Sequence, residues 1–190
     1  KRLSIATYQA VSGSGNSAVQ ELAKQTGELL NGREAKCKVY PRQIAFNALP
    51  QIDVFMENGY TKEEMKMVWE TKKIMEDDSI EVNPTAVRVP VFYGHSEAVH
   101  IETKEKITAQ ACKELLEKAP GVQVMDTRED GGYPTAVTEG ATNDPTYVGR
   151  IREDISHEKG INMWVVSDNV RKGAALNSIQ IAEILIKDYL

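Results

Sequence analysis

The feature that most constrains the fold of this chain is the interleaving of short strand-like stretches with longer amphipathic ones. Apolar and small polar side chains alternate over residues 3–8, which is typical of a half-buried strand. The glycine-rich loop 12–15 follows, and apolar residues then recur at helical spacing until Asn31 and Gly32, a common helix end. Ser17 and Gln20 have capping-box spacing, so we expect this helix to begin near Ser17.

Later segments repeat this alternation of patterns. Thr61 and Glu64 form a second capping-box signal ahead of a helix that should run to Glu76. The valines of 87–93 recur at every second position, so we expect a strand there, and Pro90 indicates an edge strand or a bulge. Further predicted elements are a strand continuing over 98–102, a helix over 108–119, short strands over 122–125, 147–151 and 163–166, and a final helix over 172–189.

Together these patterns predict an α+β fold with a mixed, largely antiparallel sheet and helices on one face. We expect residues 33–60 to be irregular, because prolines and an Asn-Gly pair interrupt a weak periodicity. The final helix is apolar on two sides, including Ile179 and Ile186, so it requires a partner surface. The uncovered face of the sheet should be apolar and should pair with a second subunit.

Composition and charge exclude several classes of function. The 190 residues contain 23 basic and 28 acidic side chains, a net charge of -5, with no basic stripe of the kind that binds nucleic acid. No apolar run approaches the roughly 18 to 20 residues that span a bilayer. Cys37 and Cys112 lack CxxC spacing and the three histidines lack HExxH spacing, so we expect no disulfide framework, no metal site and a reducing cytoplasm.

The densest group of polar residues with chemical potential lies between Asn83 and Ser96. Arg88 offers a planar fork for a carboxylate, and His95 can exchange a proton near neutral pH. On a regular strand the two side chains would point to opposite faces, but a bulge at Gly94 would bring both into one pocket. A surface arginine and a hydrogen-bonded turn histidine remain the alternative explanation from pattern alone.

Two other positions are less specific. Lys66 lies near a helix start, where a cation is electrostatically unfavourable, so an anionic partner is one explanation and a solvated lysine the other. The loop 12–15 precedes a helix and could hold a phosphate or cofactor, although it does not match GxGxxG and an ordinary flexible turn explains it better.

The sequence resembles aspartate-semialdehyde dehydrogenases at motifs that span essentially the whole chain. The segments that carry the resemblance are 7–13, 43–47, 61–66, 88–95 and 169–175. One departure is Ala86, where the family usually has a cysteine that is not its nucleophile. The resemblance implies a substrate-binding and dimerisation domain over 1–168, similar to the carboxy-terminal domain of glyceraldehyde-3-phosphate dehydrogenase. It further implies that residues 169–190 form a helix that packs on a missing nucleotide-binding domain.

The family reduces L-aspartyl 4-phosphate to the semialdehyde with NADPH, on the route to lysine, threonine and methionine. Its nucleophilic cysteine forms a thioester that hydride then reduces. By resemblance, the roles of residues in this chain are acid–base catalysis by His95, substrate binding by Gln9, Arg88 and Glu64, phosphate binding by Lys66, and NADP contacts by Ser12, Gly13 and Asn169.

The same resemblance places the nucleophile in an Asn-Cys-Ser/Thr segment upstream of the first strand, which this chain does not contain. We therefore expect the chain alone to be inactive, with NADP bound mostly by the missing domain, and to form a homodimer through its sheet. Two alternatives remain open at this stage. One is an enzyme like N-acetyl-glutamyl-phosphate reductase, which shares acyl-phosphate chemistry, and the other is a non-catalytic paralogue that acts in assembly.

Overall fold

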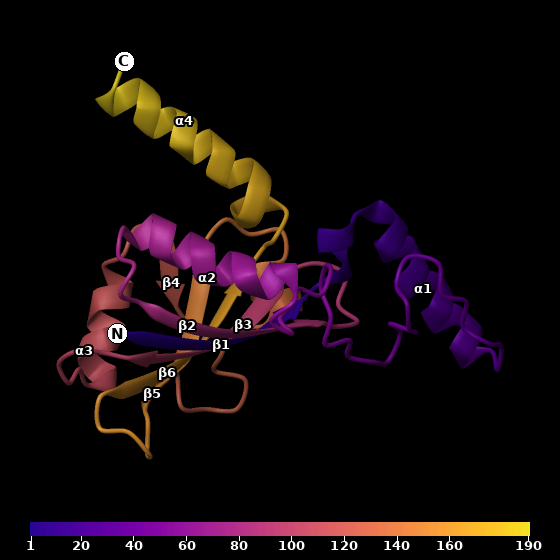
Figure 1. Ribbon diagram of the computed structural model, residues 1–190, viewed down its shortest axis with the longest axis horizontal. Coiled ribbons are helices and arrows are strands. Elements are labelled where there is room, and N and C mark those ends of the chain that lie inside the picture. Colours follow the sequence, from indigo (N-terminus) through magenta and orange to yellow (C-terminus); the bar gives the residue numbers. More distant parts are fainter.

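The computed structural model describes all 190 residues as one sheet with four α-helices and a projecting arm (Figure 1). The strands are β1 (Arg2–Gln9), β2 (Glu81–Arg88), β3 (His95–Glu102), β4 (Val122–Val124), β5 (Thr146–Glu153) and β6 (Gly160–Ser167). The helices are α1 (Asn16–Leu30), α2 (Lys62–Met75), α3 (Ala109–Glu117) and α4 (Leu176–Asp188). A 3₁₀ turn at Val11–Ser14 and π-helical turns at Ala136–Gly140 and Arg171–Ala175 complete the order.

The six strands form one mixed sheet in the order β2-β1-β3-β6-β5-β4. The pairs β1/β2 and β4/β5 are parallel, and the three central pairings are antiparallel. Because β2 and β3 flank β1 on opposite sides, the chain between them must cross over the end of β1. This confirms the predicted α+β class and its mixed sheet.

Helices α2 and α3 lie on the same face of the sheet. α3 packs over β4 and β5, where Cys112 and Leu116 join a core cluster built on Val148, Ile161 and Met163. α2 packs over β2 at the other edge. Thr61 caps α2 in the predicted capping box, because its side chain accepts from the Glu64 amide while the Glu64 carboxylate accepts from the Thr61 amide.

The arm, residues 11–60, extends from one end of the sheet and contains α1 (Figure 1). Its core cluster is Val11, Ala18, Leu22, Ile44, Ala45 and Leu49. Two buried polar side chains of α1 hold the irregular segment that follows. Glu21 accepts from the amides of residues 38–40, and Gln25 accepts from those of residues 44 and 45. Residues 33–60 are irregular, as predicted, and side chains of α1 satisfy the backbone amides of residues 38–40, 44 and 45.

Two local predictions were wrong. α1 begins at Asn16 with Gly15 as its N-cap and no side-chain cap, so Ser17 and Gln20 form no capping box. The strand expected over 87–93 ends at Arg88, and its paired residues are 81–88. Residues 89–92 instead bond to the end of β1 as the chain crosses over it, through Val89 N to Gln9 O at 3.0 Å and Val11 N to Val91 O at 2.9 Å.

The second face of the sheet is more polar than the apolar surface that we expected. Side chains that alternate with the helix-facing ones include Ser4, His100 and Glu102. The apolar part centres on Tyr8 and Trp164, whose ring centroids lie 5.5 Å apart. Tyr8 retains 38% exposure, so this face has an aromatic centre beside a row of charged and polar groups.

Candidate active site

The candidate site lies where three strand ends meet. Gln9 ends β1 and pairs in register with Arg88, the last residue of β2, while His95 is the first residue of β3. The crossing segment 89–94 brings Arg88 and His95 to either side of the end of β1. Arg88 and Gln9 are 5% and 7% exposed, so this edge of the sheet buries both polar side chains.

The main chain of Ala10 joins the two predicted site residues. Its carbonyl accepts a hydrogen bond of 2.7 Å from Nη1 of Arg88, and its amide donates one of 3.0 Å to Nδ1 of His95. Because a backbone amide can only donate, Nδ1 is unprotonated and a neutral His95 carries its proton on Nε2.

Gly13 shows that the side chains of Arg88 and His95 lie close together, on one side of the chain as predicted. A side chain at this glycine would begin 2.9 Å from Nη1 of Arg88 and 3.6 Å from Nε2 of His95, so both groups converge on the same point. Gly94 forms the turn before β3 with a φ of +85°, and a Cβ there would lie 2.6 Å from the Ala136 carbonyl oxygen. The turn therefore requires glycine at this position.

Electrostatics keep His95 neutral. Burial, and then repulsion from the Arg88 cation, lower the pKa of His95 from 6.5 to about 4. An uncharged imidazole at neutral pH can donate a hydrogen bond through Nε2 to a substrate oxygen without placing a second cation beside Arg88.

Gln9 connects this pair to the first turn of α2. Its side-chain amide donates to Oε1 of Glu63 and to Oγ1 of Thr7, both at 3.3 Å. The other carboxylate oxygen of Glu63 accepts from Lys66 at 3.1 Å, and this hydrogen bond is the main reason that the pKa of Lys66 is raised. Lys66 thus lies at the site, paired with Glu63.

Glu64, which we expected at the site, points elsewhere. Its two carboxylate oxygens accept from the amides of Thr61 and Ala86, at 2.8 and 3.0 Å. The capping box fixes Glu64 against the sheet, and because neighbouring residues on a helix point in different directions, Glu63 takes the position facing Gln9. The capping-box spacing in the sequence already indicated this, because a Glu64 side chain that caps α2 is not free to bind a ligand.

The predicted cofactor contacts form a second group beside His95. The Asn169 side-chain amide donates to Oγ of Ser12 at 2.9 Å, and its carbonyl accepts from the Gly94 amide at 2.9 Å. Sequence reasoning missed Asp168, which is 4% exposed and accepts from the amides of Thr142, Val170 and Arg171. An aspartate just ahead of a helical turn was its only sequence signal.

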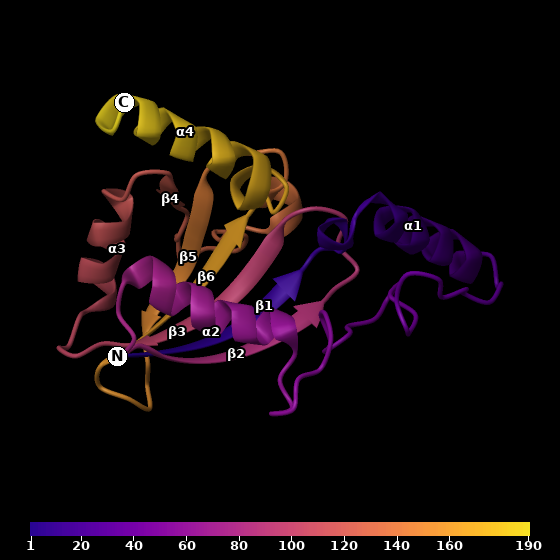
Figure 2. The same cartoon turned by 45° about the horizontal axis from the view of Figure 1, so that its top comes forward.

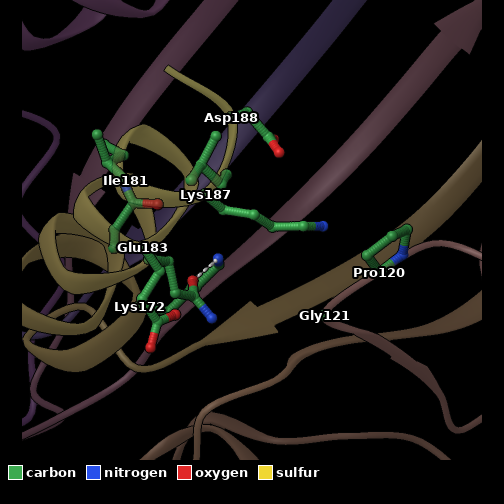
Figure 3. Close-up of a pocket in the computed structure, with 10 residues that line it drawn as sticks. Pro120, Gly121, Lys172, Ile181, Glu183, Lys187 and Asp188 are labelled. Atoms are coloured by element: carbon green, nitrogen blue, oxygen red, sulfur yellow. Dashed lines mark hydrogen bonds between the residues drawn. The ribbon is translucent and has the colours of Figure 1, made fainter. Parts of the chain in front are cut away.

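Other features of the structure lie away from this cluster. A cavity of about 440 Å³ separates α4 from the turn at Pro120 and Gly121, and Lys172 donates there to Gln180 at 2.7 Å (Figure 3). None of the residues lining it belongs to the candidate site. No group of three metal-binding side chains occurs. None of the helices combines the length and apolarity needed to cross a membrane.

The chain is similar in sequence and structure to known proteins. Residues 1–172 match the family model described as semialdehyde dehydrogenase, dimerisation domain. An aspartate-semialdehyde dehydrogenase of Shewanella violacea is 67% identical over 99% of this chain, which spans 55% of that relative. A crystal structure of aspartate semialdehyde dehydrogenase II from Vibrio cholerae, complexed with ASA, is 56% identical with a TM-score of 0.96, and this chain covers 55% of it. The chain thus spans about half the length of its relatives.

Proposed function

Because the chain belongs to the semialdehyde dehydrogenase family through its dimerisation domain, we propose that it is the substrate-binding and dimerisation part of an NADP-dependent aspartate-semialdehyde dehydrogenase. The full-length enzyme would convert L-aspartyl 4-phosphate to L-aspartate 4-semialdehyde and phosphate, in lysine, threonine and methionine biosynthesis. Both cysteines are free thiols, which suits a cytoplasmic enzyme. The observation that carries the proposal is the convergence of Arg88 and His95 on the main chain of Ala10.

Arg88 would hold the substrate carboxylate, because its buried guanidinium keeps donors that Ala10 does not use. Nη1 donates to Ala10, whereas Nη2 makes no hydrogen bond within the chain and is not among its buried unpaired atoms. An arginine held at one nitrogen is pre-oriented, so less side-chain entropy is lost when a carboxylate binds to its other donors. Gln9 would orient the acyl group beside the pair.

His95 would be the acid–base residue. Its neutral ring presents Nε2–H towards Arg88 and Gly13, where a hydrogen bond to the substrate carbonyl oxygen would stabilise developing negative charge. We place the nucleophilic thiol in the part of the enzyme outside this chain, since Cys112 packs against the core beneath α3 and Cys37 lies in the arm. The 190-residue chain should therefore bind substrate groups without turning them over.

We assign the substrate amino group to Glu63 in place of Glu64. Glu63 faces Gln9 and lies close enough to Arg88 and His95 to act on the charge of both. Lys66 would bind the phosphate. Without ligands, Glu63 and Lys66 form an ion pair with each other. On binding, the substrate amino group would pair with Glu63 and the phosphate with Lys66.

The position of Ser12, Gly13 and Asn169 beside His95 fits an NADP contact. The Asn169 amide nitrogen has a second hydrogen after donating to Ser12, and Gly13 leaves the backbone open to close approach. A Candida albicans enzyme described with NADP has the same fold at 24% identity and a TM-score of 0.67. NADPH would supply the hydride. Most of its binding surface would belong to a nucleotide-binding domain outside residues 1–168.

That domain would also cover α4, in residues 169–190. Ile179 and Ile186 are 57% and 66% exposed, and α4 stands clear of the sheet in both views (Figures 1 and 2). Because each side chain is already partly buried, completing its burial would stabilise the enzyme by roughly 1 to 2 kcal/mol.

We further propose that the open sheet face forms a two-fold homodimer. Tyr8 and Trp164 would lie at its centre, where aromatic side chains contribute most to interfaces, and the charged row with Glu102 would lie at its rim.

The test is turnover by the full-length protein, followed in the reverse direction with NADP, phosphate and aspartate semialdehyde. Arg88→Lys should raise the KM for the semialdehyde at least tenfold, while Arg152→Lys, an exposed control, should leave it unchanged. The isolated chain should show no turnover. Faster turnover of an N-acetylglutamate semialdehyde would favour the related reductase, and no turnover with either substrate would favour a non-catalytic paralogue.

A further inference from the structure

Asp168 is a buried charged side chain that the proposed mechanism does not use. It follows β6 directly and is 4% exposed. Its Oδ1 accepts from the amides of Val170 and Arg171, at 2.8 and 2.7 Å, and its Oδ2 accepts from the amide of Thr142 at 2.7 Å. Both oxygens thus accept from main-chain N–H groups, as an ionised carboxylate does.

No basic side chain pairs with this carboxylate. The guanidinium nearest to it in sequence, on Arg171, pairs with Asp144, to which its Nε donates at 2.8 Å. A buried charge without a counter-ion is costly, and hydrogen bonds from amides offset only part of that cost. Active sites are where such a cost is most often met, because a fixed charge there can act on a reacting group.

The charge of Asp168 acts on the candidate site. The next residue, Asn169, accepts from the Gly94 amide and donates to Oγ of Ser12. The main chain that carries Asp168 therefore also carries a proposed cofactor contact. Burial lowers the pKa of His95, and the negative charge of Asp168 is among the groups that oppose this lowering. Its field thus extends to the imidazole.

The proposed reaction places the nicotinamide ring of the cofactor close to His95. His95 would act on the substrate carbonyl, and the hydride must reach the carbon atom of the same carbonyl. The spare amide hydrogen of Asn169 and the open backbone at Gly13 fit this end of the cofactor. When the hydride leaves with two electrons for the acyl carbon, which is reduced, the ring changes from neutral in NADPH to cationic in oxidised NADP.

We propose that the buried negative charge of Asp168 stabilises the cationic nicotinamide ring, and thereby favours oxidised NADP over NADPH and assists departure of the hydride. The inference rests on the proposed function, in which the full-length enzyme uses NADP. The carboxylate acts through space, because main-chain amides occupy its oxygens and Asn169 makes the proposed contact. The phosphates of the cofactor carry the same charge in both forms, so their repulsion from Asp168 cancels when the two forms are compared.

The test compares the dissociation constants of oxidised NADP and NADPH for the full-length protein. Binding of NADPH is followed by its fluorescence, and binding of oxidised NADP by displacement of NADPH. Asp168→Asn removes the charge but keeps an oxygen that can accept from the amides of Val170 and Arg171. At an effective dielectric constant of about 20, the interaction of unit charges about 10 Å apart changes a dissociation constant roughly tenfold. We therefore expect the ratio of the NADP to the NADPH dissociation constant to rise roughly tenfold in this variant.

Control variants separate charge from shape, because a purely structural change would weaken the binding of both forms equally. Asp168→Glu keeps the charge, so the ratio should stay near that of the wild type even where both dissociation constants rise. Asp144→Asn removes an exposed carboxylate that is bound to the same turn, and it should leave the ratio unchanged. If Asp168→Asn does not fold, Asp168→Ser carries the same prediction, since its hydroxyl can accept from the same turn.

An unchanged ratio in the neutral variants would overturn the proposal and leave Asp168 with a structural role only. An equal rise of the ratio in Asp168→Glu would also overturn it, because shape and not charge would then be the cause. A wild type that binds neither nucleotide would refute the proposed function and this inference together. A wild type that binds both, with neutral variants of unchanged ratio, would refute this inference alone.

Discussion

The low pKa of His95 predicts a specific acid sensitivity of the fold. In the folded chain the imidazole remains neutral down to about pH 4, whereas in the unfolded chain it is protonated below about 6.5. Between these values the unfolded state binds more protons, so protonation favours unfolding as the pH falls. The stabilisation is complete above pH 6.5 and is lost progressively as the pH decreases towards 4.

The magnitude follows from the size of the shift. The pKa moves from 6.5 to about 4, and each unit corresponds to about 1.36 kcal/mol, so the wild-type protein should lose roughly 3 kcal/mol of stability from this group. His95→Gln removes the titrating ring but retains an oxygen that can accept from the Ala10 amide. The variant should lack this part of the pH dependence.

Urea unfolding followed by circular dichroism at pH 4, 5, 6 and 7.5 measures the effect on both proteins. Carboxylates far from His95 contribute equally to the two curves, so their difference reports His95 together with its coupling to Glu63 and Asp168. At pH 7.5 the wild type should be more stable relative to the variant than at pH 4, by the amount given above. Parallel curves across this range would refute the argument that burial and Arg88 keep the ring neutral.

Four further outcomes are expected. Thr61→Ala removes the cap of α2 and should cost about 1 kcal/mol in urea unfolding, and no change would mean that the cap adds nothing to stability. Gly94→Ala places a Cβ in a left-handed conformation and against the Ala136 carbonyl, so it should lower the free energy of unfolding by at least about 2 kcal/mol. A folded variant with the same urea midpoint as the wild type would contradict this. Glu97→Gln should stabilise the chain at pH 8 but not at pH 4, because the raised pKa of the carboxyl group makes wild-type stability fall as pH rises above the unfolded value; equal gains at both pH values would exclude this cause. Trp164→Lys should convert a dimer to a monomer in sedimentation, and a persistent dimer would move the interface away from the open face.

Sequence patterns located elements well where the signal was local. The capping box at Thr61 was predicted because both of its hydrogen bonds form within four residues. The same spacing at Ser17 failed, because the 3₁₀ turn that precedes α1 places Gly15 at the cap. The alternation in 87–93 was real, but the chain leaves the sheet plane at Arg88 to cross β1, which only the strand order determines.

Residue chemistry predicted the candidate site only in part. Arg88 and His95 were recognisable because a guanidinium and an imidazole stand out in a mostly apolar block, and Gly94 explained how they converge. The role of Ala10 was invisible, because main-chain donors and acceptors exist at nearly every residue and leave no mark on the sequence. The sequence could have indicated Glu63 in place of Glu64 at the site, because a carboxylate that caps a helix cannot also face a ligand.

The double attachment of Ala10 has a consequence for the choice of substrate. His95 accepts from the amide of Ala10 and Arg88 donates to its carbonyl, so both side chains are held by the main chain of one residue, directly after the end of β1. In the proposed roles, the main chain of Ala10 would then set the distance between the guanidinium that binds the substrate carboxylate and the imidazole that acts on the substrate carbonyl. Under this proposal a substrate one methylene longer would fit the pair less well. A side-chain substitution at position 10 would leave the distance between the two groups unchanged, because main-chain atoms make both hydrogen bonds.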